Sequence, residues 1–214
     1  MTIKTFEVNP LGENCYVISD DTHEAAIIDC GCSAESEWSE IKKYIAKNDL
    51  TVVHLLCTHL HFDHVWGNAY IYRDLHLKAK ASYLDLSIYE HIDRQIYEVT
   101  GVSIPHAPTP PLGDALHEDD SISFGHTTLQ VLSTPGHTQG SVCFYSEADK
   151  VLFSGDTLFR SSYGRTDLEG GSTSQMMSSL RRLSSLPDDV IVYCGHGPST
   201  DMRSEKMFNP YLPC

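Results

Sequence analysis

The strongest constraint on the fold is a set of polar side chains placed directly after an apolar strand. Residues 51–57, Thr-Val-Val-His-Leu-Leu-Cys, are mostly β-branched or apolar and predict a strand buried on both faces. The chain then continues into His59-Leu-His61-Phe-Asp63-His64. Residues two apart in an extended chain point the same way, so His59 and His61 can bind one metal ion. Asp63 and His64, where the chain turns into the next helix, can reach a second ion.

Three further polar residues follow predicted strands in the same manner. A Pro-Gly turn holds His137 after a strand predicted at 127–132, and glycines flank His196 after a strand predicted at 190–194. Asp156 follows the apolar run at 151–154. These imidazoles and carboxylates exceed what one tetrahedral ion needs and suit two ions that share a carboxylate. Two divalent metal ions are therefore expected, with zinc first and iron or manganese as alternatives.

The order of the predicted elements indicates the fold class. Short strands open the chain at 3–8, 15–19 and 25–29, with a hairpin turn at 20–23, and a helix follows from an N-cap at Ser33 to about residue 47. Later strands at 121–124, 127–132, 142–145 and 151–154 precede a glycine-rich loop at 164–171 and a helix at 173–185. Two β-rich halves, each followed by helices, predict an α/β protein with a four-layer αββα sandwich. We expect a single domain over residues 1–214.

The segment 83–113 differs from the rest and is expected to be an insertion or lid. Four apolar residues recur every fourth position and predict one amphipathic helix over 83–99: Leu84, Ile88, Ile92 and Ile96. Prolines between 105 and 111 then prevent regular structure. Tyr83, Tyr89 and Tyr97 lie on this helix, where aromatic residues are more often part of the core, so none is assigned to the site.

Composition excludes several classes of function. The chain has 15 Lys and Arg against 29 Asp and Glu, a formal net charge of −14, which disfavours a nucleic-acid partner. No apolar run reaches the ~18 residues that a membrane span needs, and the first residues lack the pattern of a secretory signal. The expected location is therefore cytoplasmic. Seven cysteines, an odd number, fit reduced thiols, and Cys30-Gly-Cys32 is interpreted as a pair of loop thiols.

Taken together, these motifs resemble the metallo-β-lactamase superfamily over nearly the whole chain. The resemblance implies that His59, His61 and His137 bind one metal and that Asp63, His64 and His196 bind another, with Asp156 bridging the two. Within the superfamily the chain is most similar to the compact glyoxalase II-like, or hydroxyacylglutathione hydrolase-like, branch. The segments that carry this likeness are 154–160, 164–171 and 200–212. β-Lactamases with two zincs usually have a cysteine at the bridging position, so Asp156 argues against that activity.

The sequence departs from full-length glyoxalase II in two respects. Those enzymes have a C-terminal helical domain that helps to bind glutathione, and the sequence after His196 is too short for one. Arg165 also stands where they have a lysine that contacts the substrate, although shorter members of the branch share both features. We expect Arg165, with Arg160 as a second candidate, to bind an anionic part of a small-molecule substrate, the alternative being a solvated loop arginine.

The resemblance implies a dinuclear thioesterase acting on S-lactoylglutathione or a related thioester through a metal-bridging hydroxide. Asp63 and Asp156 would be its catalytic carboxylates. One alternative is a persulfide dioxygenase of the same fold, which shares Gly-Arg-Thr-Asp at 164–167 and would hold a single iron through His59, His137 and Asp156. A second alternative is a non-catalytic metal-binding module. The acyl group, the thiol carrier and the oligomeric state are left open by the sequence.

Overall fold

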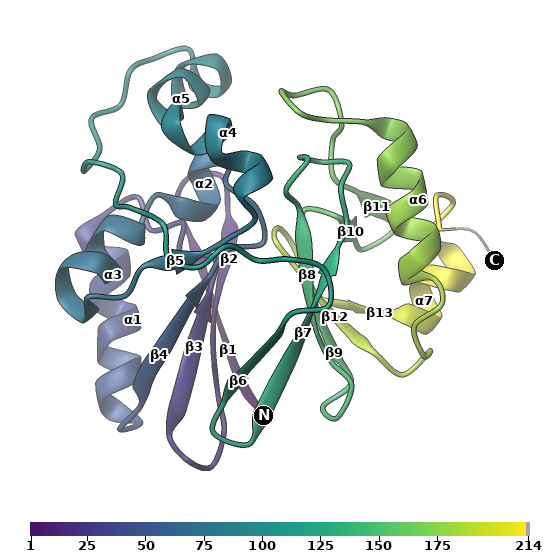
Figure 1. Cartoon of the computed structure of the whole chain (residues 1–214), viewed down its shortest axis with the longest axis horizontal. Helices are drawn as coiled ribbons and strands as arrows, with labels where there is room; N and C mark the ends of the chain where they lie inside the picture. The colour runs from purple at the N-terminus through teal and green to yellow at the C-terminus, as the bar shows by residue number, and fades with distance from the viewer. Residues whose placement is uncertain (213–214) are drawn as a thin grey trace.

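Two β-sheets face each other in the computed structural model, which describes residues 1–212, and helices cover the outer side of each sheet (Figure 1). This is the helix–sheet–sheet–helix arrangement predicted from the order of the elements. Pro213 and Cys214 lie outside the described residues.

The first sheet has five strands in the order β1-β2-β3-β4-β5. Neighbours from β1 to β3 pair antiparallel, whereas β3, β4 and β5 are parallel. The bounds are β1 (Thr2–Val8), β2 (Glu13–Ser19), β3 (Glu24–Ile28), β4 (Thr51–Leu56) and β5 (Ala79–Lys80). The predicted hairpin at 20–23 is confirmed by the pairing of β2 with β3. Since β3 and β4 are parallel, they end at the same edge, where the first histidine-bearing loop begins.

The second sheet has six strands in the order β13-β12-β9-β8-β7-β6. Only β9 and β12 are parallel neighbours, but β7 runs in their direction because it is antiparallel to β8. The bounds are β6 (Ser121–Phe124), β7 (Thr127–Ser133), β8 (Val142–Ser146), β9 (Val151–Gly155), β12 (Ile191–Cys194) and β13 (Thr200–Asp201). A separate hairpin pairs β10 (Leu158–Phe159) with β11 (Ser162–Tyr163). The carboxyl ends of β7, β9 and β12 therefore meet at one edge of this sheet.

Alternation of side chains along the strands builds the layers. On β2, Tyr16 and Ile18 pack into the core between the two sheets, whereas Cys15 and Val17 pack toward the outer helices. On β8, Val142 and Phe144 are the inner residues. The Tyr16 ring packs edge-on against Phe153 of β9, with centroids 5.2 Å apart. Both faces of the central strands are thus apolar, which is what a four-layer sandwich requires.

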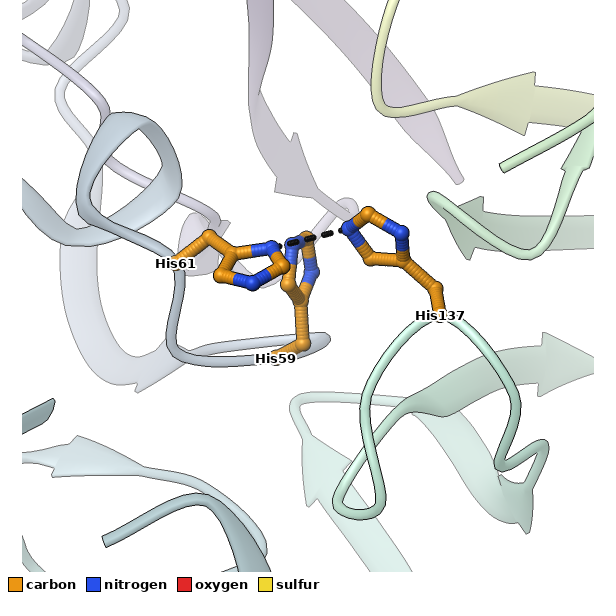
Figure 2. A group of neighbouring side chains, drawn as sticks. All are labelled: His59, His61 and His137. Atoms are coloured by element: carbon orange, nitrogen blue, oxygen red, sulfur yellow. Dashed lines mark hydrogen bonds between the residues drawn. The ribbon is translucent and has the colours of Figure 1, made fainter. Parts of the chain in front are cut away.

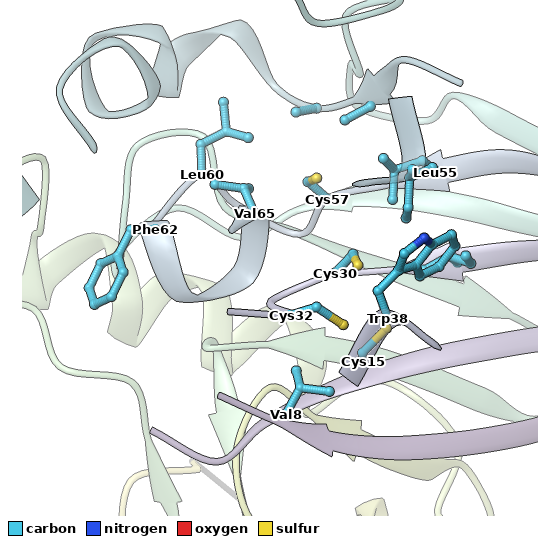
Figure 3. Close-up of a cluster of buried hydrophobic side chains, with 14 of the residues drawn as sticks. Val8, Cys15, Cys30, Cys32, Trp38, Leu55, Cys57, Leu60, Phe62 and Val65 are labelled. Carbon is cyan, nitrogen blue, oxygen red and sulfur yellow. The ribbon is translucent and has the colours of Figure 1, made fainter. Parts of the chain in front are cut away.

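Helices α1 (Glu35–Lys47), α2 (Phe62–Val65), α3 (Asn68–Leu75) and α5 (Ile92–Thr100) lie on the side of the first sheet, and α6 (Thr173–Leu183) and α7 (Met202–Phe208) on that of the second. Figure 3 shows buried side chains of the first helical layer, where Trp38 lies near Cys15, Cys30 and Cys32. These thiols are free and buried, and Cys30 and Cys32 lie in a loop as predicted. At the other end of the fold, Glu205 of α7 is a buried carboxylate.

Two helix predictions were partly wrong. The helix expected over 83–99 is divided into a 3-10 turn, η1 (Tyr83–Asp85), then α4 (Leu86–Glu90) and α5, with a break at His91. After the break, the Gln95 side chain accepts a hydrogen bond from the Phe62 amide of α2 at 3.1 Å. The N-cap of α1 is Ala34 rather than Ser33, because the Glu37 carboxylate accepts from both of their backbone amides.

The short elements α7, β5, β10, β11 and β13 were not predicted, since each has too few residues to show a hydrophobic period. Over residues 1–212, no helix has both the length and the apolar character that crossing a membrane demands.

Candidate metal centre

All four predicted polar loops meet at one edge between the two sheets. The His59–His64 loop follows β4, the His137 loop follows β7, and Asp156 and His196 follow β9 and β12. In Figure 1 these strand ends lie where the two halves of the fold come together, beneath α4 and α5. β3 and β4 run parallel in one sheet, and β7, β9 and β12 run in one direction in the other, so these side chains gather at the same edge.

His59, His61 and His137 form the first group. One ring nitrogen of each lies within 4.8 Å of the others, and all three side chains are buried. Figure 2 shows the rings turned toward one another, with His61 Nδ1 2.8 Å from His137 Nε2. Burial and the neighbouring His137 lower the pKa of His61 to about 3, and burial holds the pKa of His59 well below its usual value. Both imidazoles are therefore neutral, the form that binds a metal.

Asp63, His64 and His196 form the second group, with their ligand atoms again within 4.8 Å. His196 Nε2 lies 3.2 Å from Asp63 Oδ2 and 3.3 Å from His64 Nε2. Burial raises the pKa of the Asp63 carboxyl, but the neighbouring His64 and His196 lower it, and the net shift is below its usual value. The carboxylate is thus ionised and carries the negative charge that a cation requires.

Asp156 lies between the two groups. Its Oδ1 is 3.4 Å from His64 Nε2, and its Oδ2 is 3.5 Å from His137 Nε2 and 3.7 Å from His196 Nε2. The carboxylate therefore faces both groups of histidines at once. This is the position that a carboxylate shared by two ions would occupy.

The donor atoms of the cluster fit a metal. Within residues 1–212, His59 Nε2 and Asp156 Oδ1 are buried and have no hydrogen-bond partner. Leaving a buried polar atom unpaired costs about 1–3 kcal/mol, and more for a charged one, so such atoms ordinarily have a partner. The cluster consists of imidazole nitrogens and carboxylate oxygens, which suit divalent zinc, iron or manganese.

A second layer of contacts orients the rings. In four of the five rings, Nδ1 lies near an oxygen atom. His59 Nδ1 is 3.0 Å from Thr58 Oγ1, and His64 Nδ1 is 3.0 Å from Asp29 Oδ2. His137 Nδ1 is 2.7 Å from the Arg165 carbonyl, and His196 Nδ1 is 3.2 Å from the Leu11 carbonyl. Such contacts fix the tautomer and the orientation of a metal-binding imidazole. Asp29 also accepts hydrogen bonds from the amide and the hydroxyl of Thr58, both at 2.7 Å.

Sequence reasoning missed Asp29 and Asn14. Asn14 of β2 donates from Nδ2 to the Cys194 and Gly197 carbonyls at 3.0 and 2.8 Å, and so ties the His196 loop to the opposite sheet. Asp29 had a visible signal, because a carboxylate directly after an apolar strand also marks Asp156. Asn14 had none, since its partners lie about 180 residues away.

Close packing at the cluster explains why residue 195 is a glycine. A Cβ on Gly195 would lie 2.2 Å from Asp156 Oδ1 and 2.8 Å from the His64 ring. Any side chain there would displace the shared carboxylate. The sequence-based expectation that glycines beside His196 allow close approach of the backbone is confirmed at this position.

A cavity of about 400 Å³ opens above the cluster. The lid supplies one wall through Ile88, Arg94 and Val99, and the glycine-rich loop supplies another through Arg165, Leu168 and Glu169. The two walls touch at the rim, where Glu169 accepts from Ser87 at 3.2 Å and lies 3.6 Å from Arg94. Residues 88–99 of the segment predicted to be an insertion therefore border the cavity, and a role of 83–113 as a lid stays a prediction.

Arg165 lines the cavity, and its guanidinium forms two hydrogen bonds of 2.8 Å with Asp167 of the same loop. Arg160, the second candidate for a substrate contact, lies outside the cavity and donates to the Ser199 carbonyl. The lid tyrosines also lie outside it: Tyr83 and Tyr89 donate to the Gly113 and Pro110 carbonyls.

With the geometry in place, the family can be stated. The family model of the Metallo-beta-lactamase superfamily matches residues 8–196, a span that contains all seven residues of the cluster. The chain belongs to the metallo-beta-lactamase superfamily. The resemblance predicted from the sequence motifs is thereby confirmed, and so is the α/β fold class.

Two curated relatives match nearly end to end. The hydroxyacylglutathione hydrolase GloC of Haemophilus influenzae is 34% identical, with 99% of this chain and 98% of that protein covered. The probable metallo-hydrolase YqgX of Bacillus subtilis is 32% identical, with coverage of 99% and 98%. Both relatives are named as hydrolases, and their names share no more specific activity.

Two solved structures are similar over their whole length. The crystal structure of the BLEG-1 B3 metallo-beta-lactamase has a TM-score of 0.89 at 32% identity and covers 100% of both chains. A di-iron-bound form of TTHA1623 has a TM-score of 0.84 at 37% identity and covers 98% of this chain and 100% of that one. A similar fold can therefore hold two iron ions, so the fold alone does not select zinc.

The separation into two groups predicts the effect of Asp63→Asn on metal content. The amide keeps the shape of the side chain but binds a cation more weakly than a carboxylate does, so the group of Asp63, His64 and His196 should lose its ion. We expect the purified variant to retain about one metal per chain, against about two in the unaltered protein, by elemental analysis.

Asp167→Asn is the matched control, since this carboxylate lies beside the cavity but outside both groups, and it should leave the metal content unchanged. A full complement of metal in Asp63→Asn would contradict the division into two groups. One metal per chain in both the unaltered protein and the variant would instead favour the single-iron arrangement of His59, His137 and Asp156.

Proposed function

We propose that this protein is a dinuclear metal-dependent hydrolase that cleaves thioesters of the S-acylglutathione type. The observation that carries the proposal is the position of Asp156, whose carboxylate lies beside His137 of the first group and beside His64 and His196 of the second. One metal would be held by His59, His61 and His137, and the other by Asp63, His64 and His196. The similarity to a hydroxyacylglutathione hydrolase over nearly its full length supports the choice of substrate.

The chain supplies positioning and charge to this reaction. When bound, two divalent ions would lower the pKa of a coordinated water toward about 7 and would polarise a carbonyl oxygen. The ionised side chains of Asp63 and Asp156 supply the negative charge that holds these cations in a buried site. The floor of the cavity is formed by these same residues, so a thioester carbonyl that enters it meets the centre directly. A thiolate leaves readily, so the chain need not donate a proton to it.

The cavity walls suit a substrate with both apolar and charged parts. Ile88, Val99 and Leu168 offer apolar surface, whereas Arg165 offers a cation near the mouth. Arg165 would exchange its exposed pair with Asp167 for an anionic group of the thiol carrier. Such an exchange costs little, since exposed ion pairs contribute only about 0–1 kcal/mol.

Lactam hydrolysis is a second candidate, favoured by the similarity to the BLEG-1 B3 metallo-beta-lactamase along the entire chain. The same centre could attack a lactam carbonyl. An amine is a poorer leaving group than a thiolate and needs a proton on departure, so the thioester remains the better match.

The test is hydrolysis of S-lactoylglutathione by the zinc-loaded protein, followed by the loss of thioester absorbance. We expect turnover that disappears after chelation, returns with added zinc, and is absent in His61→Ala, whose side chain contributes to the first group. A chromogenic cephalosporin and oxygen uptake with glutathione persulfide serve as parallel assays. Turnover of either of these without thioester hydrolysis would contradict the proposal and identify the rival.

Arg165→Ala tests the substrate contact. An interaction made equally in the bound substrate and in the transition state contributes to binding alone, so KM should rise about tenfold while kcat stays nearly constant. Tenfold corresponds to the loss of about 1.4 kcal/mol, which is near the value of one hydrogen bond to a charged group. Arg160→Ala is the matched control and should leave KM unchanged. Equal KM values for both variants would remove Arg165 from the substrate site.

A further inference from the structure

Asp85 is a buried carboxylate that the proposed reaction does not use. Its side chain is 1% exposed, and it lies where the lid begins, as the last residue of η1 and the N-cap of α4. An aspartate at an N-cap ordinarily accepts a hydrogen bond from an amide in the first turn of its own helix. Within the described part of the chain, Asp85 makes no such capping bond. Its carboxylate is turned toward the metal centre instead.

The partners of Asp85 all belong to the loops of the first histidine group. Its Oδ2 accepts from the Thr138 hydroxyl at 2.7 Å, and its Oδ1 accepts from the Gly140 amide at 2.7 Å. Burial raises the pKa of this carboxyl, and the nearby Leu60 amide opposes the shift. Leu60 stands between His59 and His61, and Thr138 directly follows His137. The carboxylate therefore holds the turn after His137 to the first residue of the lid helix and lies beside the His59–His61 segment.

The fit around this carboxylate is tight. A Cβ on Gly140 would lie 2.6 Å from Asp85 Cγ and 2.7 Å from Oδ1, so glycine is required for the contact. Thr138 is itself buried, and its hydroxyl lies 2.8 Å from the Ser141 hydroxyl, which in turn accepts from the Thr138 amide at 3.1 Å. The turn that follows His137 is thus shaped around Asp85.

We propose that Asp85 is a positioning residue that sets the geometry of the first histidine group by fixing the turn after His137 to the start of the lid helix, beside the His59–His61 segment. The proposal rests on the metal-binding part of the proposed function. The lid shares this anchor, because Ile88 follows Asp85 by one turn and lines the cavity. Groups that orient metal ligands without binding the metal themselves typically contribute 10–100-fold to metal affinity.

The test is a zinc titration of the metal-free Asp85→Asn protein against a chromophoric chelator. Asparagine keeps the size of the side chain but removes its charge and replaces one acceptor oxygen with a donor, so one of the two hydrogen bonds is lost or reversed. We expect one zinc equivalent to bind about 10–100-fold more weakly while the other is unchanged. Thr138→Val, which removes one donor from the opposite side, should weaken the same equivalent to a smaller degree.

Glu205→Gln is the matched control for a loss of stability alone. Glu205 is also 1% exposed and accepts three hydrogen bonds, from Thr200, Ser161 and Asn209, but none comes from a histidine loop. This variant should be destabilised to a similar degree in thermal unfolding and keep normal zinc affinity. An equal loss of zinc affinity in Glu205→Gln would show general loosening of the fold and overturn the role of Asp85.

Unchanged binding of both zinc equivalents in Asp85→Asn would likewise overturn the proposal. If that variant does not fold, the same titration of Thr138→Val and Gly140→Ala decides whether the contact with Asp85 affects zinc binding. The readout needs no substrate. A protein that shows the zinc shift but hydrolyses no thioester would contradict the proposed function alone. A thioesterase without the zinc shift would contradict the role of Asp85 alone.

Discussion

Clustering of five imidazoles and two carboxylates, all buried except the half-buried His196 and Asp156, at one edge between two sheets is the condition on which this structure depends. Charged groups taken out of water are costly unless opposite charges or hydrogen bonds compensate them. In this cluster the compensation is partial. Asp63 and Asp156 lie beside histidines, but His59 Nε2 and Asp156 Oδ1 have no hydrogen-bond partner among residues 1–212. A pair of cations would complete these contacts, which links the stability of this edge to its chemistry.

The rest of the fold holds these groups in place. β4 delivers the His59–His64 loop, and Asp29 at the end of the neighbouring β3 fixes both Thr58 and the His64 ring. Asn14 reaches across to the opposite sheet and holds the loop of His196. The site is therefore assembled from both halves of the sandwich, and neither sheet carries all of it.

The sequence predicted the residues of the candidate metal centre because each of them follows an apolar strand, a pattern that is visible locally. Contacts that depend on distant partners were not readable, which is why Asn14 was missed. The lid shows the same limit. A four-residue apolar spacing predicted one helix, yet Leu84 is 69% exposed, whereas Ile88, Ile92 and Ile96 are buried. The helix breaks at His91, and beyond the break Gln95 accepts a hydrogen bond from the Phe62 amide. No local sequence pattern contains such a tertiary contact.

Anomalous X-ray scattering at the zinc edge from crystals of the zinc-loaded protein would show how many ions each chain binds and where. A dinuclear centre predicts two peaks per chain, one bordered by His59, His61 and His137 and the other by Asp63, His64 and His196, with the Asp156 carboxylate between them. A single peak on the three-histidine side, with Asp63 and His196 free of metal at saturating zinc, would contradict the dinuclear centre.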